Sequence, residues 1–255
     1  MTQTRYLKQR RINLLPEPKE LKHCNKEYER LKKICSEVAE LEKSGSLVVQ
    51  PLKNYVHIRL VSIVEQQLKV VSHTLIDEFS INAKELLDHD ELTIPLNLLD
   101  YFKKGQITKG KVITTEYQFT NVTEIGKFFS YVNGVDSPNR KRKKPFNYKS
   151  SPFFDWIQDL KHIPKSKDMF GYFGDILKKR VEIVHFLDEL SESTEDLSKK
   201  VARVQGFVNL FYAATFINLS RNDKEKRKSL EEISKIYFGM PIKEFSKITN
   251  KHKIS

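Results

Sequence analysis

The chain of 255 residues carries 45 lysines and arginines against 33 aspartates and glutamates, which gives a formal net charge of +12. Hydrophobic residues at 39% and charged residues at 31% describe a soluble protein that forms a core, and nine glycines with nine prolines disfavour an all-β architecture. The positive charge favours encounter with polyanions, RNA above all, or with an acidic protein partner, although a general preference for solubility would give the same balance.

The chain holds two cysteines, Cys24 and Cys35, eleven residues apart on one expected helix. That separation is too long for a disulfide between them, and such thiols are typical of the reducing cytoplasm. The N-terminus lacks the apolar core of a signal peptide, and no apolar run approaches the length of a membrane span. We therefore expect a cytoplasmic protein that does not enter a membrane. Spacings typical of zinc, phosphate or dinucleotide sites are absent, so we expect no metal and no cofactor.

The spacing of apolar residues predicts an all-α fold, an up-and-down helical bundle. Residues 1–16 are basic and polar and are expected to form an arm. A helix is expected from about Pro18 to Lys43, with a narrow apolar seam that suits either a peripheral helix of the bundle or a coiled-coil dimerisation arm. The next helix, 52–79, has a broad apolar surface and is expected to be central.

The middle of the chain is expected to interrupt the bundle. Two short helices are predicted at 81–89 and 95–103. The stretch 107–120 is rich in Thr, Val, Ile, Tyr and Phe, with Lys109-Gly110-Lys111 as a turn. This composition predicts a small inserted β-hairpin or irregular segment, followed by a helix at 123–131.

The second half of the chain returns to helical spacing. Helices are predicted at 152–160, 168–190 and 197–219, with one or two weaker amphipathic helices between 230 and 248. We divide the chain into a basic arm with a peripheral helix at 1–50, a helical bundle at 51–221 with an insertion near 105–150, and a C-terminal helical tail at 222–255.

Five consecutive cations form the most basic tract of the sequence: Arg140, Lys141, Arg142, Lys143 and Lys144. Such a run either stays solvated as a surface loop or binds the phosphates of an RNA strand. Aromatic residues follow it, and cations beside aromatic rings can hold single-stranded RNA. Among these aromatics, however, Phe153, Phe154 and Trp156 stand at helical spacing and are expected in the core.

The expected helix 168–190 carries the candidate site. Phe173, Ile176 and Ile183 lie on one apolar stripe, and Arg180 falls in register with it. An arginine is almost never fully buried without a partner, so Arg180 either reaches water or meets an anion. Five residues later comes His185, whose side-chain type titrates near neutral pH.

This Arg-x4-His spacing, in the form Arg-x-x-Ile-Val-His, resembles the motif of the HEPN superfamily of all-helical nucleases. Two further features fit that family: an early helix that carries Arg59 to Glu65, and a long apolar helix, Val201 to Leu219, after the motif. The resemblance covers roughly Tyr55–Arg221. The sequence departs from the family at Val181, where a polar residue, often Asn, usually follows the arginine.

The resemblance implies a metal-independent endoribonuclease of toxin or antiviral-defence type. A histidine can act as base or acid, and an arginine can hold and neutralise a phosphate, roles that fall to His185 and Arg180. Lys178 and Lys179 precede them and are candidate RNA contacts, as is the tract 140–144. The expected products are 2′,3′-cyclic phosphate and 5′-hydroxyl ends.

Five residues of ideal helix separate the directions of Arg180 and His185 by about 140°. The family's usual arrangement answers this, since two motif helices face each other across the cleft of a homodimer. The resemblance therefore also implies a homodimer, with an antitoxin or defence-system protein as a further partner. The alternative is a non-catalytic module that uses the same groove to bind RNA or a protein, which Val181 favours.

Overall fold

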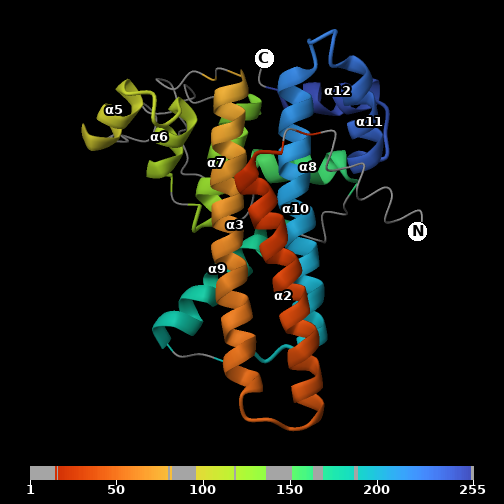
Figure 1. The fold of residues 1–255 in the computed structure, drawn as a ribbon. Coiled ribbons are helices and arrows are strands. Elements are labelled where there is room, and N and C mark those ends of the chain that lie inside the picture. The colour runs from red at the N-terminus through yellow and green to blue at the C-terminus, as the bar shows by residue number, and fades with distance from the viewer. Residues whose placement is uncertain are drawn as a thin grey trace, which may run out of the picture.

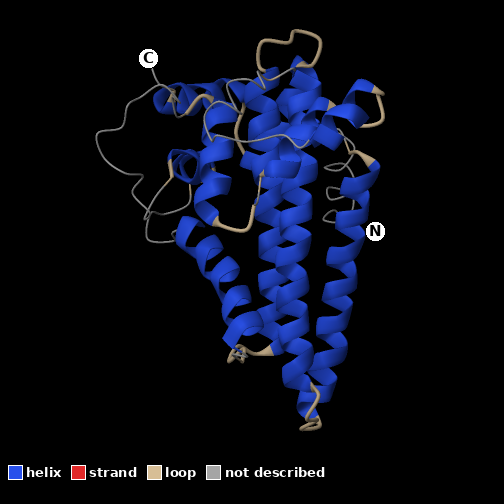
Figure 2. Ribbon diagram, turned by 90° about the vertical axis from the view of Figure 1, so that its left-hand side faces the viewer, coloured by secondary structure: helices blue, strands red, loops and turns tan. Residues whose placement is uncertain are grey.

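A computed structural model describes residues 15, 17–79, 81, 96–117, 119–135, 151–162, 169–186 and 189–253. Throughout these ranges the regular structure is helical and no strand occurs, as Figure 2 shows. The predicted all-α, up-and-down helical bundle is confirmed. The basic arm 1–14, the tract 140–144 and the expected helix 81–89 lie outside the described residues, except for Ile81 at the start of that helix.

Three long helices run beside one another along the molecule: α2 (Lys19–Lys43), α3 (Val49–Phe79) and α10 (Thr194–Ser220). The chain descends α2, turns at Gly45, where φ is +68°, and ascends α3 (Figure 1). The seam predicted for α2 is buried against its neighbours, at Leu21, Cys24, Tyr28, Leu31, Cys35 and Val38. Packing of α2 along α3 and α10 makes it a helix of the same bundle.

Polar side chains join the three long helices inside the bundle. The hydroxyl of Tyr28 donates to Oε1 of Gln67 over 2.8 Å, and Nε2 of Gln67 donates to Oδ1 of Asn209 over 2.9 Å. Tyr28 and Gln67 are fully buried. A buried hydrogen-bonded chain of this kind fixes the register of packed helices, because displacing one partner leaves the others unsatisfied.

An aromatic core lies where α7 (Val122–Asn133), α8 (Pro152–Leu160) and α10 meet. Phe153 stacks on Phe129 at 5.0 Å between ring centroids and meets Phe211 edge-on at 5.1 Å. Phe153, Phe154 and Trp156 are fully buried, so their prediction as core residues is confirmed. Rings in these geometries add stabilisation beyond the apolar area that they bury.

The predicted β-hairpin at 107–120 is wrong, because residues Lys109–Glu116 form the helix α6. Thr108 caps it by accepting a hydrogen bond from the amide of Lys111. Gly110, expected in a turn, lies in the first helical turn, and its amide donates to Oδ1 of Asp77 over 2.7 Å. Val112 and Ile113 are buried, so packing on α3 overrides the β propensity of this stretch.

Four further helices complete the description. α5 (Leu96–Lys103) ends before Gly105, in the left-handed region at φ +67°. α11 (Arg227–Phe238) and α12 (Ile242–His252) are the two helices of the predicted C-terminal tail. α9 (Met169–Phe186) packs on α3 and diverges from the long helices toward its end (Figure 1). None of the described helices combines the length and the apolar character that a membrane span needs.

The helix predicted at 168–190 does not reach its expected end, because Leu190 is outside α9. The amide of Leu190 donates to Oδ1 of Asn54 over 3.3 Å, and its carbonyl accepts from Nε2 of Gln50 over 3.1 Å. Leu190 is buried in this position. Side chains of α3 therefore take the hydrogen bonds that a longer helix would have supplied.

Candidate functional site

The helix α9 carries both residues of the Arg-x4-His motif in its last two turns. Phe173, Ile176 and Ile183 are buried toward the bundle. Arg180 lies on that same side of the helix and is half-buried. The spacing predicted Arg180 in register with the apolar stripe, and the structure places it there. His185 is exposed, one residue before α9 ends.

Arg180 has an unsatisfied hydrogen-bonding group. Its Nε is withdrawn from solvent and has no hydrogen-bond partner. Within the described ranges no carboxylate forms an ion pair with Arg180, whereas Lys178 and Lys179 both pair with Glu182, at 3.5 Å and 3.3 Å. A guanidinium held at the edge of a core without an anion is ready to accept one, because a buried donor gains from any oxygen that reaches it.

The two motif residues face different surroundings within one copy of the chain. Arg180 is half-buried on the side of α9 that carries the buried residues, and His185 is exposed. The rotation of about 140° expected for five helical residues accounts for this separation. One copy therefore does not bring Arg180 and His185 to a single phosphate.

Apolar side chains stand exposed beside the two motif residues. Val181 is 44% exposed, Val184 47% and Phe186 76%. Single exposed apolar residues are ordinary, but here three occur within six residues, with Val181 and Val184 on one side of the helix and Phe186 at its end. They follow from the divergence of α9, since the bundle no longer covers the end of the helix. We call this the α9 patch.

The predicted RNA contacts Lys178 and Lys179 border a hollow of about 440 Å³ between α9, the segment 190–192 and Lys200 of α10. Three cations and three carboxylates line it, the latter being Asp175, Glu182 and Glu192. The charges of the hollow are therefore balanced. Binding of RNA by this pair of lysines stays a prediction.

A buried histidine fastens α9 to α3 behind this hollow. Nε2 of His57 donates to the carbonyl of Ile176 over 3.0 Å, so the neutral ring carries its proton there. The other ring nitrogen, Nδ1, is 4.0 Å from Oε1 of Glu192 and has no hydrogen-bond partner. Burial lowers the pKa of His57 below its ordinary value, which keeps the ring neutral. His57 is thus a structural residue.

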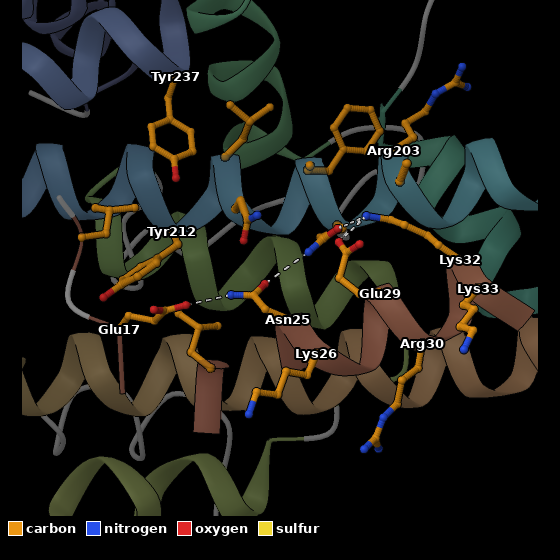
Figure 3. A pocket seen from close by; sticks show the side chains of 18 of the residues that line it. Glu17, Asn25, Lys26, Glu29, Arg30, Lys32, Lys33, Arg203, Tyr212 and Tyr237 are labelled. Atoms are coloured by element: carbon orange, nitrogen blue, oxygen red, sulfur yellow. Dashed lines mark hydrogen bonds and ion pairs between the residues drawn. The ribbon is translucent and has the colours of Figure 1, made fainter. Parts of the chain in front are cut away.

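One groove on the surface of the described chain could not be predicted from the sequence. A groove of about 980 Å³ runs between α2 and α10 (Figure 3). Lys26, Arg30 and Lys33 follow the outer edge of α2, and Arg203 lies on the far side of α10. The signal was the three-four spacing of these α2 cations, but its meaning depends on which helix packs beside α2.

Comparison with known proteins gives no relative. No family model matches the sequence, and neither a curated protein nor a solved structure matches it significantly.

Proposed function

We propose that this protein is a metal-independent endoribonuclease whose active site is built from the α9 helices of two copies. The proposal is supported by the half-buried Arg180, whose guanidinium has no carboxylate partner in the described chain and an unsatisfied Nε. Because the spacing of Arg180 and His185 resembles the HEPN motif, we infer that the anion bound by Arg180 is an RNA phosphate.

The chemistry requires a base, a cation and an acid. His185 of one copy takes the proton from a ribose 2′-hydroxyl, and the 2′-oxygen attacks the adjacent phosphorus. The bond from phosphorus to the 5′-oxygen breaks, and that oxygen takes a proton from water. Arg180 neutralises the charge that develops on the phosphoryl oxygens. The products are a 2′,3′-cyclic phosphate and a 5′-hydroxyl end.

A second copy of the chain would supply the residue that one copy cannot bring to the phosphate. Because Arg180 and His185 point apart on one helix, a phosphate can meet both residue types only where two helices meet. In the α9 patch, Val181 and Val184 lie between them and Phe186 follows His185, and these side chains give an apolar surface for that contact. A two-fold dimer would bring each patch against its copy, as isologous interfaces do.

The test is cleavage of total RNA by purified protein in excess EDTA. Wild-type protein is expected to cleave, while Arg180→Ala and His185→Ala each lose at least about a hundredfold in rate. Circular dichroism should show unchanged helical content, because neither residue belongs to the fully buried core. Cleavage at the wild-type rate by either variant would sink the assignment.

A second function is favoured by one residue. Val181 is exposed and apolar where the family usually has a polar side chain, so α9 would suit a non-catalytic module that binds RNA or a protein. An antitoxin or another defence-system protein is the partner expected in either case. Retention of RNA by the wild type without any cleavage would favour this second function.

A further inference from the structure

We propose that the groove between α2 and α10 is a docking site for an acidic amphipathic helix of a partner protein. This site lies apart from the α9 motif and does not depend on nuclease activity. Three features of the groove support the proposal: its shape, the charge of its edges and the state of its polar floor.

The groove is long enough to hold a helix of about three turns. Its α2 side runs from Leu21 to Lys33, a length of about 18 Å, or three helical turns. On α10, Gly206 is exposed, and a Cβ atom placed there would meet nothing within 4 Å. Apolar atoms of Leu21, Phe207 and Leu210 contribute to the lining. A helix with an apolar face can lie along such a channel at the usual separation of packed helices.

The charge of the groove selects an acidic occupant. Six cations line it, against two carboxylates, Glu17 and Glu29. Lys26 and Lys33 are exposed and form no ion pair within the described chain. Residues 1–14, which precede the groove in the sequence, contain cations and no acid, so their charge opposes binding there. Acidic residues flanking the apolar face of a helix would meet the cations along both edges.

The polar floor argues for a helix over an RNA strand. Its amides already bond to neighbours: Nε2 of Gln205 donates to Oδ1 of Asn25 over 3.2 Å, and Nδ2 of Asn25 donates to Glu17 over 2.9 Å. These groups are engaged and cannot read bases. Glu17 and Glu29 would repel the continuous line of phosphates of a strand, whereas the acidic residues of a helix occur only at intervals along its edges and can face the cations.

The experiment measures fluorescence anisotropy with the full-length protein. The probe is a labelled helical peptide of about 18 residues, with leucines on one face and glutamates beside them. Its comparison peptide has lysines in place of the glutamates, and a single-stranded oligouridine RNA is the third ligand. The acidic peptide is expected to bind at least about tenfold more tightly than the lysine peptide.

Gly206→Leu is the decisive variant. It fills the groove from a position with open space, so the melting temperature should hold or rise while affinity for the acidic peptide falls at least about tenfold. Lys26→Glu with Lys33→Glu should weaken binding similarly. The matched control, Lys103→Glu with Lys104→Glu, makes the same charge change at exposed residues at and beyond the end of α5 and should leave affinity unchanged.

Three outcomes would overturn the proposal. The acidic peptide could fail to bind the wild type, or it could bind Gly206→Leu equally well. Alternatively, Gly206→Leu could weaken the binding of oligouridine and not of the peptide, which would assign the groove to nucleic acid.

Discussion

Arg180 and His185 share α9 but not one face of it, since Arg180 is half-buried against the bundle and His185 stands in solvent. The two residues would therefore act together only across an interface between copies. Of the α9 patch, Val181 and Val184 lie between them along the helix, and Phe186 directly follows His185. This arrangement links the proposed chemistry to the oligomeric state.

The α9 patch should hold the dimer together. Val184→Glu combined with Phe186→Glu places two carboxylates in the expected interface, where burying unpaired charge is costly. The variant should be monomeric in sedimentation velocity at micromolar concentration and should lose RNA cleavage. Leu47→Glu is the control, because Leu47 is 95% exposed in the turn between α2 and α3. A dimer that survives the double change would locate the interface elsewhere.

Replacing glycine with alanine should have opposite effects on stability at Gly110 and at Gly206. At Gly110 a new methyl carbon would lie 2.3 Å from the carbonyl oxygen of His73, so α6 and α3 would have to separate. Gly110→Ala should lower the free energy of unfolding by about 1–3 kcal/mol. Gly206→Ala meets open space and should raise it by about 0.5–1 kcal/mol through helix propensity. Urea denaturation measures both, and a stabilising Gly110→Ala would contradict the packing described for α6.

The buried His57 makes stability depend on pH. Burial lowers the pKa of His57 below the ordinary 6.5, and the nearby charges of Lys200 and Lys179 lower it further. The hydrogen bond to the Ile176 carbonyl and the charge of Glu192 raise the pKa, but they do not offset the effect of burial. Below about pH 6.5 the unfolded ring binds a proton that the folded ring refuses. The stability from this group is thus full above that pH and falls as the pH drops, by at most about 1.4 kcal/mol per pH unit.

His57→Gln removes this titration and keeps a donor near the carbonyl of Ile176. Its unfolding free energy should vary less between about pH 7 and pH 5.5 than that of the wild type. Burial also lowers the pKa of His73, so the variant keeps part of the dependence. The carboxyl groups of Glu27 and Glu42 have lowered pKa values and act below their ordinary 4.5, outside this window. Equal slopes in the two proteins would refute a buried neutral His57.

The tract from Arg140 to Lys144 can be tested through its charge. If these cations bind backbone phosphates, replacing all five with Ser should weaken RNA binding for every sequence and flatten its dependence on salt, because fewer counterions are released. The cleaved bond should not change, since phosphate contacts position a strand without reading its bases. Affinities at three salt concentrations decide the matter. An unchanged slope would mean that the tract does not touch RNA.

The spacing of apolar residues predicted most of the helices, but it predicted few of the contacts around the candidate site. The seam of α2 and the core position of Phe153 follow from apolar spacing, which packing respects. The stretch around Gly110 is helical and not a hairpin, because its β-branched residues and its glycine pack against α3, which local spacing does not reveal. The early end of α9 depends on Asn54 and Gln50, more than 130 residues away in the chain.

The ion pairs of the site and the charge of the groove could be predicted only in part, because they depend on which helices pack together. Arg180 was recognised as an unusual arginine from its place in an apolar stripe. Spacing alone does not determine that Glu182 pairs with both Lys178 and Lys179, although both lysines lie within reach of it along the helix. The groove beside Lys26 and Lys33 could not be predicted, because it exists only where α10 lies next to α2.

The central claim is that Arg180 of one copy acts with His185 of the other. Arg180→Ala and His185→Ala, each inactive alone, should be unfolded and refolded together so that mixed dimers form. A mixed dimer keeps one intact pair, so RNA cleavage in EDTA should return to about a quarter of the wild-type rate for random mixing in an isologous dimer. Unmixed variants measured side by side set the background. Mixtures that stay at this background, while mixed dimers are shown to form, would contradict the composite site.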